Sequence, residues 1–244
     1  VTPGTGGGGD EGETGTVSQR FVTQNFDNAV NVSNTVINVP NLANDDYIVW
    51  NQNTTKTANF YTIKSGDSVN QSSYIAGSRK SQIPIEMTID THDADGTATP
   101  APAVESGKLL YCDMRIKRVD TTDDPVSLKL LDAAGAEIFE LYFASSRIPQ
   151  LKAAQTYGTL TNDPAQTDVT FPYSTDWVYV RAVIDFAQKT FELYQGNTLE
   201  NLTPFVDGTT TFGFKNTAAA NVYKLTAGWK GVLCFDDIDI YSMN

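Results

Sequence analysis

Short stretches in which apolar and polar residues alternate recur along the chain from Phe21 onward. Clear examples are EIFELYFA at Glu137–Ala144 and WVYVRAVIDF at Trp177–Phe186. A period of two places successive side chains on opposite faces of a strand, and the abundance of Val, Ile, Tyr and Phe favours strands further. The same pattern predicts strands at Ile83–Ile89, Lys108–Val119, Val126–Leu131, Thr190–Tyr194, Thr211–Lys215 and Val232–Tyr241.

Turn-forming residues separate these stretches, as at Asp132–Gly135 (DAAG) and at Asp207-Gly208. A long helical pattern is hard to find, and the best candidate is the short segment Leu151–Tyr157. Many short strands without intervening helices are typical of sandwiches rather than of α/β folds. We therefore predict an all-β fold, a two-sheet antiparallel jelly-roll sandwich.

The composition changes near residue 20. Residues 1–19 are rich in Gly, Thr and acids and contain almost nothing apolar, so they cannot bury enough surface to offset the entropy of ordering. The sequence predicts a flexible leader at 1–19 and one β-sandwich domain at 20–244. Two polar stretches that contain prolines, 90–107 and 156–175, are predicted as long loops.

Charge and cysteine content exclude several classes of function. Lys and Arg total 17 against 29 Asp and Glu, which gives a net charge of -12. Such a surface repels phosphate backbones, so no nucleic-acid partner is expected. The apolar runs are far shorter than the ~20 residues that cross a bilayer. Cys112 and Cys234 both lie in strand-like runs and are predicted to face the core, either as buried free thiols or as a disulfide between neighbouring strands.

Strand parity also separates side chains that face solvent from those that face the core. Phe139 and Leu141 share one face of their strand and valines share one face of theirs, which leaves polar residues on the opposite faces. Sugar sites combine aromatic faces with planar polar groups. We expect the outer side of one sheet, with a stacking residue from a Tyr- and Trp-rich region, to supply ligand-binding residues: Glu140, Tyr142, Tyr179, Arg181, Arg115 and Trp50. The alternative is that these side chains serve only cross-strand pairing.

Several segments resemble known domains. The opening FVTQNFD at Phe21–Asp27 and the closing FDDIDIY at Phe235–Tyr241 resemble the first and last strands of jelly-roll modules in carbohydrate-active proteins. The segment Asp176–Asp185, followed by Lys189–Tyr194, is similar to the pattern W-x-x-V-x-x-x-[IV]-D…K-[TS]-x-x-[VL]-[YF] of concanavalin A-like (laminin G-like) domains. The turn at Asp132–Ile138 fits the hairpin that precedes this pattern in those domains.

This resemblance implies a role in extracellular glycan recognition or breakdown, often within bacterial polysaccharide-degrading systems. The Gly-rich leader looks like the tether of a surface lipoprotein, although the chain lacks the Cys that would carry the lipid. In jelly-roll modules the first and last strands pair and share a structural Ca²⁺, which implies the metal ligands Asp27, Asp236 and Asp237. The alternative for Asp236 is capping of a nearby loop by backbone N–H groups. Alternation places Asp236 inward with Cys234 and Ile238, unless a bulge intervenes.

Catalytic signatures are missing from the sequence. His92 is the only histidine, and its acidic loop Asp90–Gly96 is expected to be an ordinary turn rather than a second calcium site. Neither the Glu-x-Asp-x-x-Glu strand of related hydrolases nor the R-x-E-x-R and Q-I-H motifs of lyases occurs. We expect an exported, tethered, non-catalytic domain that binds a polysaccharide or oligosaccharide. The alternatives are a lyase or hydrolase of the same fold, with Tyr142, Tyr179, Arg181 and Arg147 available for lyase roles, and a structural or adhesive surface domain.

Overall fold

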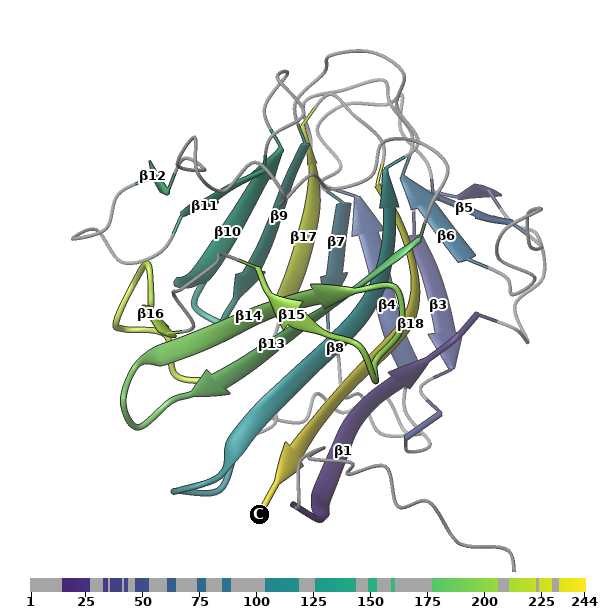
Figure 1. Ribbon diagram of the computed structural model, residues 1–244. Coiled ribbons are helices and arrows are strands. Elements are labelled where there is room, and N and C mark those ends of the chain that lie inside the picture. Colours follow the sequence, from purple (N-terminus) through teal and green to yellow (C-terminus); the bar gives the residue numbers. More distant parts are fainter. Residues whose placement is uncertain are drawn as a thin grey trace, which may run out of the picture.

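A computed structural model describes residues 15–26, 33–34, 36–40, 42–43, 47–52, 61–64, 74–77, 85–88, 104–118, 126–143, 149–152, 159–160, 177–205, 211–222, 224–229 and 233–244. These residues form strands and turns, without a helix, in two antiparallel sheets (Figure 1). The predicted all-β, two-sheet antiparallel jelly-roll sandwich is therefore confirmed.

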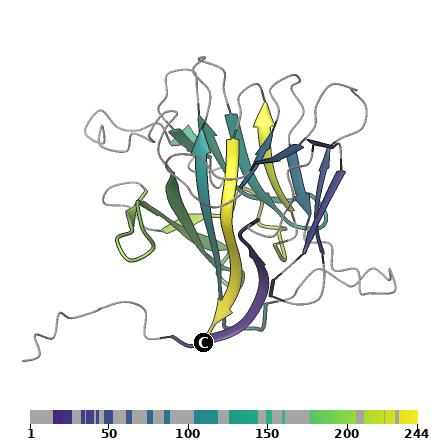
Figure 2. The ribbon, with the colours of Figure 1, turned by 90° about the vertical axis from the view of Figure 1, so that its right-hand side faces the viewer.

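The ten-stranded sheet contains the two terminal strands. Its order is β15 (Thr203–Pro204), β14 (Thr190–Gly196), β13 (Val178–Asp185), β8 (Leu109–Arg118), β18 (Leu233–Met243), β6 (Tyr74–Gly77), β5 (Tyr61–Lys64) and β2 (Ser33–Asn34). In addition, β1 (Val17–Gln24) pairs with β18, and β16 (Thr211–Gly213) pairs with β14. Figure 2 shows β1 and β18 side by side. The first and last strands are neighbours, as the resemblance implied.

The eight-stranded sheet lies opposite. Its order is β12 (Thr159–Leu160), β11 (Pro149–Lys152), β10 (Glu137–Phe143), β9 (Val126–Leu131), β17 (Lys224–Trp229), β7 (Ile85–Thr88), β4 (Tyr47–Gln52) and β3 (Val36–Pro40). The predicted strands agree with these elements within a few residues. In the short helix candidate Leu151–Tyr157, Leu151 and Lys152 instead belong to a strand and pair with β10. Strand β1 includes Val17 and Gln19, which lie within the expected leader and pair with the end of β18.

The core fills the space between the two sheets. The ten-stranded sheet contributes Met114, Ile116 and Phe191, and the eight-stranded sheet contributes Leu128 and Phe139. The rings of Phe139 and Phe191 meet across the sandwich with their centres 5.1 Å apart. Complete burial of each such side chain stabilises the fold by about 1.5–3 kcal/mol, so the alternating pattern seen in the sequence decides which faces meet.

The two cysteines are both buried and both free. Cys112 lies in the core, as alternation predicted. Cys234 is instead paired in register with Lys117, on the face of β8 that points away from the core. The two strands pair Cys112 with Ile240, so the two thiols stand at different levels of the sheet. This register explains why the alternative of a disulfide between neighbouring strands is not realised.

Candidate functional site

The last strand is interrupted where it changes partner. On one edge, β18 pairs with β6 at Cys234 and Phe235, and with β1 only from Ile238 onward. On its other edge, the register with β8 shifts between Asp236 and Asp239. Asp237 lies inside this bulge with a φ of 46°, a left-handed conformation that Asp tolerates better than most residues. The bulge therefore follows from the change of partner and sets the direction of the acids around it.

The bulge reverses the expected direction of Asp236. Phe235 pairs with Ile116, whose side chain is in the core, and Asp236 pairs with Arg115 on the opposite face. Because β18 contains one extra residue here, the alternation shifts and Ile238 joins the core. Asp236 thus shares the outer face of the sheet with Arg115, yet it is fully buried, and its Oδ1 accepts a hydrogen bond of 2.9 Å from the Asp237 N–H. Backbone capping, the alternative weighed for Asp236, is one of its interactions.

Four side chains gather beside the bulge, and we call them the bulge cluster: Arg115, Trp177, Tyr179 and Asp237. The Arg115 guanidinium carbon lies 5.4 Å from the Trp177 ring centre and 5.5 Å from the Tyr179 ring centre. Its Nη1 is 3.6 Å from the Asp237 Oδ2, and the Tyr179 hydroxyl donates to the same oxygen at 3.1 Å. The side chains of Arg115 and Asp237 remain 20% and 33% exposed, so a ligand can reach them.

Burial and charge settle the protonation of the phenol in this cluster. Burial raises the pKa of Tyr179 to about 12, and the negative charge of Asp237 acts in the same direction. Arg115 opposes this effect without cancelling it. Tyr179 therefore keeps its proton at neutral pH, which makes it a hydrogen-bond donor and acceptor rather than a base.

A second group of side chains on the same outer face makes its contacts within the group. The Arg181 guanidinium donates to both carboxylate oxygens of Asp113, at 2.7 and 2.9 Å. The rings of Tyr111 and Tyr241 stack with centres 5.3 Å apart, and Arg181 and Arg20 lie against Tyr111 and Tyr241, respectively. These five side chains come from four adjacent strands and pack against one another. Arg181, one of the predicted ligand-binding residues, therefore serves to order the sheet.

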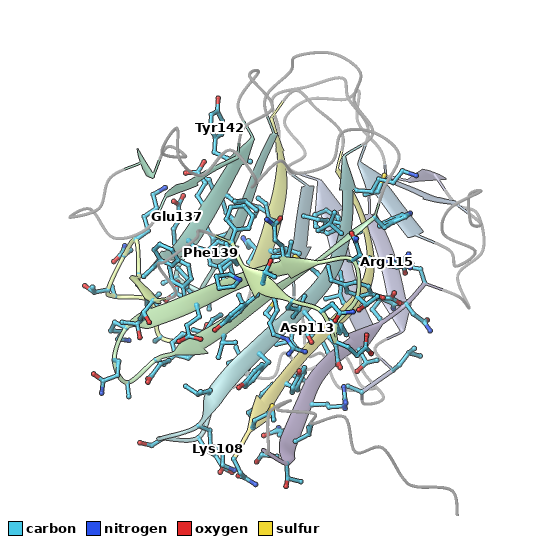
Figure 3. The ribbon with its side chains drawn as sticks, viewed as in Figure 1. Lys108, Asp113, Arg115, Glu137, Phe139 and Tyr142 are labelled. Carbon is cyan, nitrogen blue, oxygen red and sulfur yellow. The ribbon has the colours of Figure 1, made fainter. Side chains whose placement is uncertain are left out.

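Two predicted ligand-binding residues lie on the other sheet, so the expectation of a single lined face is wrong. Glu140 and Tyr142 belong to β10, and Figure 3 shows Tyr142 far from the labelled Asp113 and Arg115. Parity within β10 was correct, but parity does not tell which sheet a strand joins. Glu140 is buried and accepts hydrogen bonds of 2.8 Å from Ser127 and of 2.8 Å from Lys215. It is thus a structural ion-pair partner in this molecule.

The structure describes only some of the remaining predicted site residues. The backbone of Trp50 lies in β4, but its side chain falls outside the described part of the chain, and so does Asp27. Among the described residues, no group of three His, Cys, Asp or Glu side chains is placed to hold a metal. Asp236 and Asp237 do not fit Ca²⁺ by themselves, because Ca²⁺ takes six to eight oxygens and Arg115 already faces Asp237. Calcium remains a prediction that depends on Asp27.

Sequence reasoning missed Asp113, Tyr111, Trp177 and Tyr241. A usable signal was present, since Tyr111, Asp113 and Arg115 alternate with core residues in the predicted strand at Lys108–Val119. Finding their partners, however, requires knowing that β13 and β18 flank β8. The alternation of residues within one strand does not reveal which strands lie beside it in the sheet.

No protein-family model and no curated protein matches the sequence. Solved structures that match in fold include arcelin-5, a lectin-like defense protein from Phaseolus vulgaris, with a TM-score of 0.46, 8% identity, and coverage of 85% of this chain and 97% of that chain. A lectin from Bauhinia forficata in complex with GalNAc gives a TM-score of 0.45 and 7% identity, covering 87% and 98%. A sialidase gives 0.46 and 8%, and there the match covers 92% of this chain and only 19% of the sialidase. What each of these proteins binds or does is a property of that protein.

Within the described ranges, the chain has no helix of the length and apolar character that spanning a bilayer requires.

Proposed function

We propose that this chain is a non-catalytic, extracellular carbohydrate-binding or accessory domain, and that its ligand contacts the bulge cluster. One observation carries the proposal: Arg115 and Tyr179, selected from the sequence as sugar-binding candidates, meet beside Trp177 and Asp237 on one face. A guanidinium, a phenol and a carboxylate supply donors and acceptors for sugar hydroxyls. Their mutual contacts hold them in place before a ligand arrives, which reduces the entropic cost of binding.

The chemistry of Tyr179 favours binding over catalysis. A lyase of this fold would use a Tyr to remove a proton beside a uronate carboxylate, and a general base works best when its pKa lies near the working pH. The pKa of Tyr179 is raised to about 12. The second tyrosine suggested for such a role, Tyr142, lies on the other sheet and cannot assist. A tethered location in a polysaccharide-degrading system belongs to the same proposal and derives from the resemblance in sequence.

The proposal is tested by binding of the purified chain to a glycan array and then by titration with the best ligand. Tyr179→Phe removes one hydroxyl, and loss of one hydrogen bond corresponds to about 0.5–1.5 kcal/mol, so we expect a weaker Kd by roughly two- to tenfold. Arg115→Gln is expected to weaken binding more, because its hydrogen bonds are charge-assisted.

Tyr142→Phe is the matched control, since it makes the same change on the eight-stranded sheet. It should leave Kd unchanged. Equal Kd values for the wild type and both bulge-cluster variants would refute the location of the site. Release of unsaturated oligosaccharides from a polysaccharide would refute the non-catalytic assignment, and a purely structural domain would bind no glycan at all.

A further inference from the structure

Three arginines on the outer face of the ten-stranded sheet have carboxylate partners. Arg181 makes its two hydrogen bonds to Asp113, and Arg20 forms an ion pair with Asp239. Arg115 faces Asp237 at 3.6 Å. A guanidinium that is already opposite a carboxylate offers much less attraction to a second anion, because the two charges largely cancel at a distance. None of these three arginines therefore presents an uncompensated charge to a ligand.

Carboxylates also outnumber cations among the described side chains of this face. Strand parity and register place four cations there: Arg20, Arg115, Lys117 and Arg181. The acids on the same face are Asp113, Asp185, Glu192, Asp236, Asp237 and Asp239. The whole chain carries a net charge of -12, so the surroundings do not reverse the local excess. At physiological salt a charge is screened over about 8 Å, so a sugar on the bulge cluster is affected chiefly by Asp237 and the groups beside it. Asp185 and Glu192 stand at register positions six and four residues along β13 from Tyr179 and contribute little there.

We infer that the bulge cluster accepts uncharged glycans and discriminates against uronate-bearing or sulfated ones. This inference rests on the proposed function and adds the chemical class of the ligand. A neutral sugar exchanges hydroxyl hydrogen bonds with Arg115, Tyr179 and Asp237 without bringing a second negative charge beside Asp237. An anionic sugar meets repulsion from Asp237 and its neighbours and finds Arg115 already opposed by a carboxylate.

Asp237 is the residue on which the discrimination depends most. Its Oδ2 lies 3.6 Å from the Arg115 Nη1, and its side chain is one-third exposed. Asp237→Asn removes the charge and keeps the shape, and Asn tolerates a φ of 46° as well as Asp does. The variant should therefore fold normally and remove the exposed negative charge beside Arg115. We expect it to gain affinity for anionic glycans by roughly five- to tenfold, the effect of one unit charge at contact distance in a solvent-exposed site.

The experiment compares two sets of polysaccharides on the full chain, in the presence of a chelator so that no divalent cation bridges acids. The uncharged set contains xylan, mannan and mixed-linkage β-glucan, and the anionic set contains polygalacturonate, alginate and a sulfated galactan. Each set is titrated with wild type and with Asp237→Asn at low and at high salt. The expected result is binding within the uncharged set that changes little with salt, and a gain toward the anionic set in the variant alone.

Two other outcomes distinguish a failure of this inference from a failure of the proposed glycan-binding function. Preferred binding of the anionic set by the wild type, weakening as salt rises, would leave a glycan-binding domain but overturn the inferred ligand class. Binding of neither set would remove the proposed function and the inference together. A variant whose preference equals that of the wild type would show that Asp237 does not set the discrimination, and the inference in its stated form would then be wrong.

Discussion

Single acidic residues organise the turns of this molecule, and Asp132 is the clearest case. Its carboxylate is buried and accepts hydrogen bonds from the Ala136 N–H at 2.7 Å and from the Ala220 N–H at 3.2 Å. One side chain thus fixes the hairpin between β9 and β10 and also fastens a distant segment to it. Gly135 completes the turn at a φ of 85°, a conformation in which any side chain is strained.

Replacing Asp132 by Ala should lower the free energy of unfolding by about 1–3 kcal/mol, since two backbone donors lose an acceptor that water replaces poorly. Asp185→Ala is the matched control. Asp185 accepts from the Ala187 and Gln188 N–H groups in the same manner, but at an exposed turn. Denaturant titration of both variants measures the difference. Equal losses would mean that burial of Asp132 adds nothing to its role.

The two thiols allow a second prediction at the scale of residues. Cys112 and Cys234 are both buried, and burial raises the pKa of the Cys112 thiol well above its ordinary value. Since the thiolate is the reactive form, neither cysteine should react with a thiol reagent in the native protein, and both should react after unfolding in denaturant. Rapid native labelling, or a bond between the two cysteines, would contradict the placement of these strands.

Among the elements, the segment after β16 links the two sheets. The Lys215 N–H donates to the Ile138 carbonyl and the Asn216 N–H to the Glu137 carbonyl, both at 2.8 Å. The Lys215 side chain then reaches Glu137 and Glu140, forming an ion-pair group that also includes Lys129. Burial alone would raise the pKa of both glutamates, but their bonds to these lysines, and to Ser127 at Glu140, outweigh it and hold each pKa below its ordinary value.

This ion-pair group predicts loss of stability in acid. A carboxyl whose pKa is lower in the folded than in the unfolded chain contributes stability above its ordinary pKa of about 4.3, and this contribution disappears as the pH falls through the folded pKa. Unfolding free energy should therefore fall as the pH drops below about 4. In Glu140→Gln this acid limb should be shallower, whereas Glu105→Gln, at an exposed position, should keep it. Chemical denaturation from pH 3 to pH 7 measures the slopes, and parallel curves for all three proteins would contradict the assignment.

The elements also show which features the sequence could reveal. Alternation predicted the buried faces of β10 and β13 correctly, because burial of one face is a local property of each strand. It could not reveal that these strands lie in opposite sheets, so Glu140 was grouped with Tyr179. It also left Asp236 undecided, because a bulge shifts the parity of every residue that follows. Both failures concern partners that are distant in sequence.

For the whole molecule, the decisive feature is that both ends of the described chain lie together. The Asn244 N–H donates to the Thr16 carbonyl at 3.1 Å, and β1 runs antiparallel to β18 from that point (Figure 1). Strand β18, which carries Asp237, is thus the last described strand and pairs with the first. The fold requires β1 and β18 to be adjacent. This pairing does not require the chain to be open between these two strands.

A circular permutant tests this view of the whole fold. A short Gly/Ser linker would join Asn244 to Gly15, and new ends would be opened between Leu199 and Glu200, which are exposed in the turn after β14. Few buried contacts are lost there, so the unfolding midpoint should lie close to that of a chain that starts at Gly15. A control permutant opened between Met114 and Arg115 cuts β8, which pairs with both β13 and β18, and it should not fold. If the first permutant failed as the control does, the uninterrupted connection through residues 199–200 would be part of what holds the sandwich together. If it folded and kept its glycan affinity, the bulge cluster would depend on the pairing of β1, β18 and β8 and not on the order in which the chain supplies them.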